Sequence, residues 1–146
     1  MDAHIIIGSD HGGFERKEEI KAFLQSKGYI VEDVGAFSAD SVDYPEFAFA
    51  VSEKVSDGTF PRGIVVCTSG IGVSMVANKS RNVRAALCTS VEHARLSRLH
   101  NDANVLAIGA KFSDKDTATQ ICEVWLTTEF EGDRHQKRIE KIHNIE

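Results

Sequence analysis

Short apolar runs rich in β-branched residues alternate with helical patterns from one end of this chain to the other. Such runs are typical of buried strands, and apolar residues at three- and four-residue spacing are typical of amphipathic helices. A regular strand–helix alternation predicts a five-stranded parallel sheet with helices packed on both faces. The expected strands cover residues 3–8, 29–34, 64–66, 83–88 and 105–109, and the expected helices cover residues 14–27, 45–55, 73–79, 93–99, 118–125 and 134–145.

Length, charge and cysteine content narrow the class of protein. The chain has 146 residues, of which 42% are hydrophobic, so residues 1–146 are expected to form one α/β domain with a substantial core. The formal charge of −5 argues against nucleic acid as a partner. We expect no membrane span and no signal peptide, because long apolar stretches and a basic N-terminus are missing. Three cysteines without paired spacing argue against disulfides and a zinc site and favour the cytoplasm.

The most informative segment covers residues 63–74, which read Gly-Ile-Val-Val-Cys-Thr-Ser-Gly-Ile-Gly-Val-Ser. A strand, a glycine-rich turn and a helix in succession aim several backbone N–H groups into one concavity, which binds anions or a developing oxyanion. Cys67 lies at the edge of this concavity, and the positive end of a helix dipole favours a thiolate. The glycine spacing fits neither a P-loop nor the dinucleotide fingerprint. A base or nucleophile beside an oxyanion hole is the functional hypothesis, and an inert buried cysteine is the alternative.

Ligands of open parallel sheets bind beyond the carboxyl ends of the strands, so polar residues that follow strands are further candidates. Asp10 and His11 follow the first expected strand and precede two glycines. One interpretation is a turn in which a solvated Asp10 caps the next helix. The other is a site in which Asp10 binds ligand hydroxyl groups or assists proton transfer, and His11 binds a phosphate.

Two candidates lie further along the chain. His100 is expected at the end of a helix, outside its apolar stripe, where it either interacts favourably with the helix dipole or takes part in catalysis. Lys111 follows the fifth expected strand in Gly109-Ala110-Lys111. It is a candidate contact for an anion, with a solvated loop lysine as the alternative.

The last expected helix carries a basic face. Arg134, Arg138 and Lys141 are spaced by four and three residues, which places them on one side of a helix. A solvated basic face is one interpretation. The other is a phosphate clamp, because guanidinium groups make planar, bidentate contacts with phosphate oxygens. His135 adds a further donor nearby.

Other residues in this half of the chain are expected to be structural. Cys122 and Trp125 belong to one apolar helical stripe, and Ile139 and Ile142 are expected on the buried side of the last helix. Cys88 ends the fourth expected strand and could approach the crevice, but nothing beside it indicates activation.

Six blocks of residues occur in a characteristic order: Gly8-Ser9-Asp10-His11-Gly12-Gly13-Phe14, Asp43-Tyr44-Pro45, Cys67-Thr68-Ser69-Gly70-Ile71-Gly72, Arg81 to Arg84, Leu96-Ser97-Arg98-Leu99-His100-Asn101-Asp102-Ala103-Asn104-Val105-Leu106 and Gly132-Asp133-Arg134-His135-Gln136-Lys137-Arg138. With these six blocks in this order, the chain resembles the type B ribose-5-phosphate isomerases. The resemblance covers about residues 4–145, and the blocks at 97–104 and 134–138 make it specific.

The resemblance implies a Rossmann-like, three-layer α/β/α sandwich that works as a homodimer or a dimer of dimers. Each active site is then shared between two subunits. The implied reaction interconverts ribose 5-phosphate and ribulose 5-phosphate through an enediolate, without a metal or another cofactor. Such an aldose–ketose isomerisation needs one base that reaches two adjacent carbons and a stabilised enediolate, and Cys67 beside a row of amides can supply both.

The resemblance also implies a role for each matched residue. Cys67 is the base that moves a proton between C1 and C2, and His100 helps to open the furanose ring with support from Asp10 and Ser69. The backbone amides of residues 68–72 hold the enediolate oxygen. The implied substrate-binding set is Asp10, His11, Tyr44, Thr68, Ser69, Gly70, Ile71, Gly72, Asn101, Lys111, Arg134 and Arg138, of which His11, Arg134 and Arg138 bind the phosphate.

At three positions the chain departs from the family pattern: Thr68 stands where Gly is common, Ser69 where Thr is common, and Lys111 where Arg is common. Two alternatives to the pentose reaction stay open. One is an isomerase of a six-carbon sugar phosphate, such as galactose 6-phosphate or allose 6-phosphate, because one sequence does not give the size of the pocket. The other is a sugar-phosphate-binding module without turnover, although binding alone does not need a thiol base.

Overall fold

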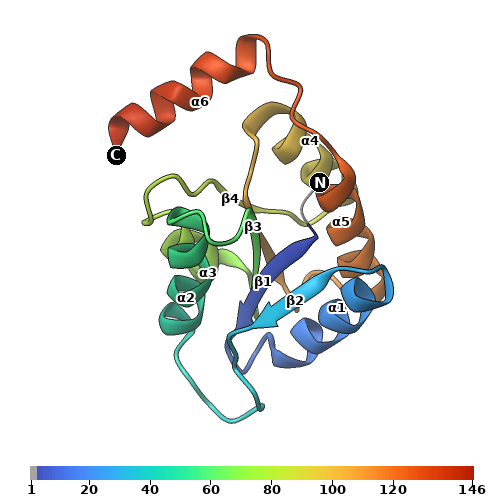
Figure 1. The fold of residues 1–146 in the computed structure, drawn as a ribbon. Helices are drawn as coiled ribbons and strands as arrows, with labels where there is room; N and C mark the ends of the chain where they lie inside the picture. Colours follow the sequence, from blue (N-terminus) through green and yellow to red (C-terminus); the bar gives the residue numbers. More distant parts are fainter. Residues whose placement is uncertain (1–2) are drawn as a thin grey trace.

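A computed structural model describes residues 3–146, which form five strands and six helices. The strands are β1 (His4–Ser9), β2 (Ile30–Asp33), β3 (Arg62–Cys67), β4 (Ala85–Leu87) and β5 (Val105–Gly109). The helices are α1 (Phe14–Ser26), α2 (Tyr44–Ser56), α3 (Ile71–Ala77), α4 (Val91–Asn101), α5 (Lys115–Thr127) and α6 (Arg134–Ile145). All strand pairs are parallel, in the order β2-β1-β3-β5-β4 (Figure 1).

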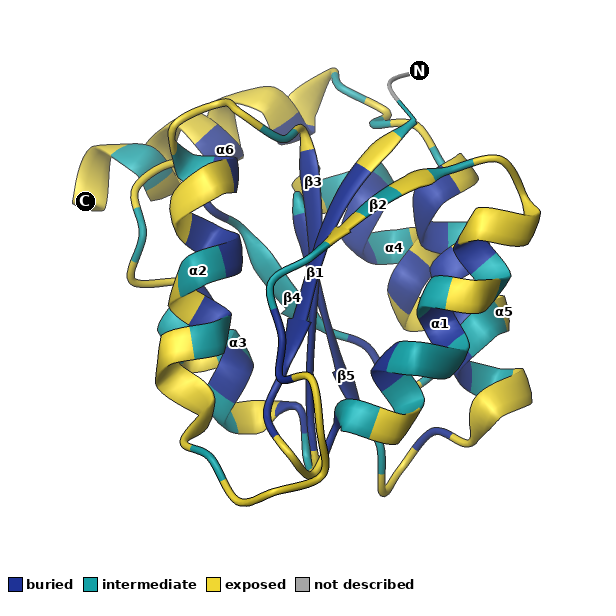
Figure 2. Ribbon diagram, turned by 60° about the horizontal axis from the view of Figure 1, so that its bottom comes forward, coloured by how far each residue is buried: buried dark blue, intermediate teal, exposed yellow. Residues whose placement is uncertain are grey.

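The sheet is the middle of three layers (Figure 2). Because side chains alternate along a strand, Ile5 and Ile7 of β1 join one core cluster with α1, α4 and α5, and Ile6 joins the other with α2 and α3. The central strands β1, β3 and β5 are therefore buried on both sides, which is why they read as unbroken apolar runs. The predicted three-layer α/β/α fold is confirmed.

Helix α6 lies outside this sandwich, across the end of the sheet where the strands begin (Figure 1). Ile139 packs toward the body of the protein and is 6% exposed, but Ile142 is 45% exposed. The expectation that both residues are buried is wrong for Ile142. A helix that crosses the end of the sandwich contacts it through a narrow stripe of side chains, and Ile142 lies largely outside that stripe. Within residues 3–146, no helix combines the length and the apolar composition that a bilayer crossing requires.

Strands β1 and β3 form the crevice of the sheet. They are hydrogen-bonded neighbours, yet the chain leaves β1 toward α1 on one face and leaves β3 toward α3 on the opposite face. Two connections that diverge from adjacent strands leave a gap between them, and this is where open α/β sheets bind ligands. The topology therefore brings the segments after Ser9 and after Cys67 to one place.

A buried ion pair fixes the loop beside this crevice. The ammonium group of Lys17, which is fully buried, donates to both carboxylate oxygens of Asp33 at 2.7 and 2.6 Å, and the amide of Gly35 donates to Asp33 Oδ1 at 2.8 Å. Burial alone would raise the pKa of the Asp33 carboxyl, but hydrogen bonds from Lys17 and Lys21 outweigh it and the pKa is lowered. The end of β2 is thereby held against α1, and the loop that follows starts from a fixed point.

Candidate active site

A cavity of about 410 Å³ opens at the carboxyl ends of β1 and β3. Its lining contains seven residues of the predicted site and one, Met75, that sequence reasoning missed. Met75 lies one helical turn after Ile71 on α3, and that spacing is the signal that could have found it. The lining residues are Asp10, Tyr44, Cys67, Thr68, Ser69, Ile71, Gly72 and Met75.

Cys67 is the last residue of β3 and is 5% exposed. Its Sγ accepts a hydrogen bond from the backbone amide of Gly70 at 3.1 Å. This contact requires Gly70 to adopt a left-handed conformation, with φ at +78°, which turns the chain directly into α3. The turn therefore holds the sulfur at the wall of the cavity with an amide donor beside it.

The other two cysteines have a different environment. Cys88 and Cys122 are buried in the core beneath α4 and α5, and neither lines the cavity that contains Cys67. Burial raises the pKa of Cys88 to about 11 and that of Cys122 to about 12. Both are therefore protonated thiols at neutral pH, in agreement with the structural role predicted for them.

The loop after Cys67 is tied to the end of β5 and to its own helix. The amide of Lys111 donates to the carbonyl of Thr68 at 2.9 Å, and the amide of Ile71 donates to Ser69 Oγ at 3.1 Å. The Thr68 side chain lies over Gly12, so closely that a Cβ at Gly12 would collide with its hydroxyl. Thr68, one of the departures from the family pattern, is thus accommodated by the absence of a side chain at Gly12.

Asp10 lies just before α1 but does not cap this helix, whose N-cap is Gly13 without a side-chain cap. Asp10 Oδ1 accepts a hydrogen bond from the amide of Gly13 at 2.9 Å. Asp10 is not solvated either, because it is buried, and it lines the cavity. Its neighbour His11 is exposed and does not line the cavity, and its Nδ1 lies 3.0 Å from the carbonyl oxygen of Val42.

The remaining predicted residues are divided between the two ends of the sheet. Lys111 follows β5 at the carboxyl end and is exposed. His100 and Asn101 end α4, which runs back from the carboxyl end of β4 to the start of β5, and Arg134 and Arg138 lie on α6 (Figure 1). Within one chain, these four residues therefore lie at the opposite end of the sheet from Cys67.

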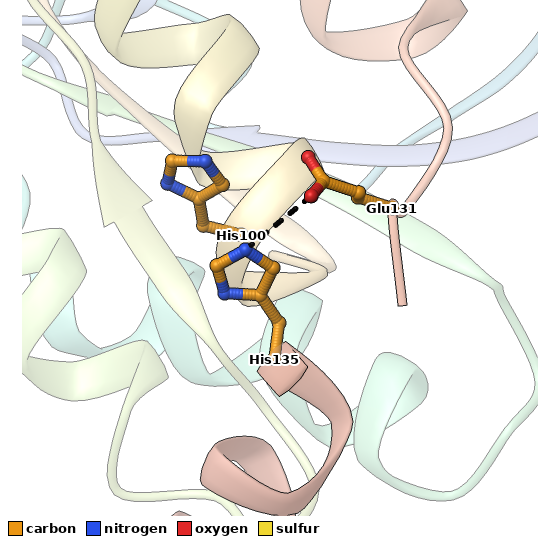
Figure 3. Close-up of side chains that lie close together, drawn as sticks. All are labelled: His100, Glu131 and His135. Atoms are coloured by element: carbon orange, nitrogen blue, oxygen red, sulfur yellow. Dashed lines mark ion pairs between the residues drawn. The ribbon is translucent and has the colours of Figure 1, made fainter. Parts of the chain in front are cut away.

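His100 belongs to a cluster at this opposite end (Figure 3). Its ring is stacked on the ring of His135, with centroids 4.4 Å apart and planes 19° apart. Glu131 Oε1 lies 3.8 Å from His135 Nε2, and sequence reasoning missed this residue. The amide of Glu131 donates to the carbonyl of Leu99 at 3.1 Å, so the segment before α6 is fastened to the last turn of α4.

The end of α4 is itself held rigidly. Arg98 Nη1 donates to Asp102 Oδ1 and to the carbonyl of Ala103, both at 2.7 Å. Asn101, next to His100, lines a separate cavity of about 300 Å³ beneath α6, together with Arg84 and Ile142. His100 and Asn101 therefore project from a fixed helix end.

Comparisons with known proteins agree with this architecture. A model of the family described as Ribose/Galactose Isomerase matches residues 5–142. The chain is 43% identical to ribose-5-phosphate isomerase B of Escherichia coli over 142 residues, which cover 97% of this chain and 95% of that protein. The structure of Clostridium thermocellum ribose-5-phosphate isomerase B superposes with a TM-score of 0.96 at 49% identity, covering 97% of this chain and 96% of the other.

A second solved structure contains a ligand. Ribose-5-phosphate isomerase B from Mycoplasma genitalium with bound ribulose-5-phosphate superposes with a TM-score of 0.93 at 40% identity, covering 97% of this chain and 95% of that one. The family model and both superpositions extend over nearly the whole chain, and the residues matched by the family model include the loop after Cys67 and most of helix α6. This chain therefore belongs to the ribose/galactose isomerase family.

Proposed function

We propose that this protein is a ribose-5-phosphate isomerase, which interconverts ribose 5-phosphate and ribulose 5-phosphate through an enediolate without a metal ion. The observation that carries the proposal is the thiol of Cys67, which lies beside the Gly70 amide at the crevice of a sheet of this family. The E. coli relative is named as this enzyme, and the M. genitalium relative binds one of the two sugars. The three cysteines are free, a state that the reducing cytoplasm maintains.

The first chemical step opens the furanose ring of ribose 5-phosphate. The bond between C1 and the ring oxygen O4 breaks, the O1 hydroxyl loses its proton as the C1 carbonyl forms, and O4 gains a proton. We assign proton donation to O4 to His100 and acceptance of the O1 proton to Asp10, with the Ser69 hydroxyl as a supporting contact. Asp10 suits this role because its buried carboxylate is held in place by the Gly13 amide and faces the cavity.

The second step moves hydrogen between the two carbons. The Cys67 thiolate removes the proton from C2 and leaves an enediolate across C1 and C2. The same sulfur then returns the proton to C1, while the proton on O2 is transferred to O1. The amide of Gly70 already donates to Cys67 Sγ, and that of Ile71 donates to Ser69 Oγ. The first turn of α3 has further N–H groups without partners inside the helix, and this turn includes the cavity residue Gly72. These amides are suited to the negative oxygen of the enediolate.

The complete site requires two subunits in this proposal. Cys67 and Asp10 lie at the carboxyl end of the sheet, and His100 lies at the amino end of the same chain, so a second copy supplies the histidine. Large apolar side chains surround the cavity: Tyr44, Ile71 and Met75 are all exposed. Exposed apolar side chains grouped in this way are typical of a surface that another protein covers.

The phosphate is then bound from both sides. His11 and Lys111 lie at the carboxyl end of one subunit, and the exposed guanidinium groups of Arg134 and Arg138 approach from helix α6 of the other. The two arginines are four residues apart on one face of the helix, which allows both to reach one phosphate group. Lys111 contributes a single charged group where an arginine would offer a planar fork.

An activity assay with a panel of sugar phosphates tests the proposed substrate. Purified protein in the presence of EDTA is expected to isomerise ribose 5-phosphate with a kcat/KM at least about 10-fold above that for galactose 6-phosphate or allose 6-phosphate, because one extra carbon must fit the same cavity. A preference for a six-carbon sugar would reassign the substrate within the family. Binding of all these sugars without turnover would instead favour a binding module.

A further inference from the structure

His135 is a buried histidine beside the proposed phosphate clamp, and the mechanism above gives it no task. It is 5% exposed, although its neighbours Arg134 and Gln136 on α6 are exposed. Its Nε2 atom is buried and has no hydrogen-bond partner within residues 3–146. A polar side chain is rarely buried in this state without a reason connected with function or a missing partner.

The main contact of this side chain is with His100. The two rings lie face to face, with centroids 4.4 Å and planes 19° apart (Figure 3). His100 projects from the last turn of α4 and is only partly buried, and the ring of His135 packs against one of its faces. A side chain at a helix end has several rotamers available, and a flat ring packed against it selects one of them.

Together with Glu131, the two histidines have the residue types of a metal site, and their ligand atoms lie within 4.8 Å of one another. The orientation of the rings does not fit such a site. A metal ion lies in the plane of each imidazole that binds it, and two nearly parallel, stacked planes cannot both contain the same ion. The stacking therefore favours a role in which one ring supports the other.

We infer that His135 is a positioning residue, which holds the imidazole of His100 in the orientation needed to deliver a proton to the furanose ring oxygen. This inference rests on the proposed function, in which His100 of one subunit serves the cavity of the other. His135 acts through His100 and does not touch the reacting atoms.

The charges around His135 support this assignment. Burial is the largest effect and lowers its pKa, and the cationic groups Arg134 and Arg138 of α6 and His100 of α4 act in the same direction, whereas Glu131 opposes them. The lowered pKa favours the neutral form of the His135 ring. A neutral aromatic ring stacked on an imidazolium attracts it, whereas two charged rings at this distance would repel each other.

Two substitutions separate the stacking from the other properties of the side chain. His135→Ala removes the ring and is expected to lower kcat for ribose 5-phosphate about 10- to 100-fold with little change in KM, because a misplaced acid reacts slowly. His135→Phe keeps a flat ring and is expected to recover most of that loss. Lys137→Ala, an exposed position on the same helix, is the matched control, and thermal unfolding of each variant measures any loss of fold.

A substrate that cannot form a ring identifies the affected step. The 4-deoxy analogue of ribose 5-phosphate has no hydroxyl on C4 and its C5 oxygen is esterified, so it stays open-chain and bypasses ring opening. His135→Ala is expected to turn over this analogue within about threefold of the rate of the unaltered protein, since Cys67 still meets the open chain. Equal losses on both substrates, a rise in KM alone, or no recovery with His135→Phe would each overturn the inference.

The proposed function itself is tested separately in the same series. If the unaltered protein isomerises neither pentose phosphate, or if Cys67→Ala keeps its activity on the open-chain analogue, the proposed function fails whatever the His135 variants do. If Cys67→Ala loses both activities and the His135 variants behave like Lys137→Ala, only the positioning role is wrong.

Discussion

Replacing Cys67 with alanine is expected to lower kcat for ribose 5-phosphate about 10²- to 10⁴-fold, the usual contribution of a general base. Binding of the sugar phosphate is expected to stay close to that of the unaltered protein, because in the proposed mechanism the sulfur acts on the reacting carbons and not on the phosphate. The Sγ atom accepts one hydrogen bond, from Gly70, and its loss leaves the loop contacts of Thr68 and Ser69 in place. Steady-state kinetics and calorimetric titration with ribose 5-phosphate measure the two quantities.

Cys88→Ala is the matched control for this experiment. Cys88 is as deeply buried as Cys67, but it lies beneath α4 in a core cluster that does not reach the cavity. The kcat of the Cys88→Ala variant is expected to stay within about twofold of that of the unaltered protein, since a buried thiol with a raised pKa takes no part in proton transfer. Comparable losses in the two variants would show that the effect comes from packing, and full activity of Cys67→Ala would remove the sulfur from the mechanism.

Arg138→Ala is expected to raise KM for ribose 5-phosphate about 10- to 100-fold with a smaller effect on kcat, because it removes the charge-assisted contact with the phosphate that we propose for this residue. Arg138 is exposed on α6, so its removal leaves no buried charge unpaired and the stability of the fold should change little. Inorganic phosphate is expected to inhibit the unaltered protein competitively and the variant more weakly. Initial rates over a grid of substrate and phosphate concentrations provide all of these constants.

Lys137→Ala serves as the control here as well, because it removes a positive charge from the neighbouring position of the same helix. Its KM is expected to change by less than about twofold, as an exposed charge outside the clamp acts only through screened, long-range attraction. If inorganic phosphate proved to be a noncompetitive inhibitor, or if both variants raised KM equally, the phosphate would be bound elsewhere.

The sequence predicts the bounds of some elements accurately. Strand β5 and helix α6 begin and end where the pattern placed them, at residues 105–109 and 134–145. Central strands are buried on both faces, so their apolar runs have clear limits. The edge strand β4 is shorter than expected, covering Ala85–Leu87 instead of residues 83–88, because its outer side has no neighbouring strand to extend the pairing. Helix α3 begins at Ile71 and not at the expected residue 73, because the left-handed Gly70 turns the chain directly into the helix.

The site is predictable only in part. Asp10 and Cys67 were candidates because ligands of open parallel sheets bind at the ends of strands, and both residues line the cavity. The adjacency of β1 and β3, which creates that cavity, cannot be read from one chain pattern, because strand order depends on how the crossovers pack. Residue types alone also do not reveal that His100 and Arg138 lie at the other end of the sheet, since that follows from the direction in which α4 returns and from the path of α6.

The separation of Cys67 from His100 within one chain leads to a simple experiment with mixed subunits. Cys67→Ala and His100→Asn are each expected to be inactive with ribose 5-phosphate when they are assembled alone. Mixed pairs, isolated through the different affinity tags of the two co-expressed variants, are expected to recover roughly half of the unaltered activity, because one of the two sites in each mixed pair has both native residues. If the mixed assemblies are as inactive as the single variants, each site is built from one chain, and the shared arrangement proposed for this enzyme is wrong.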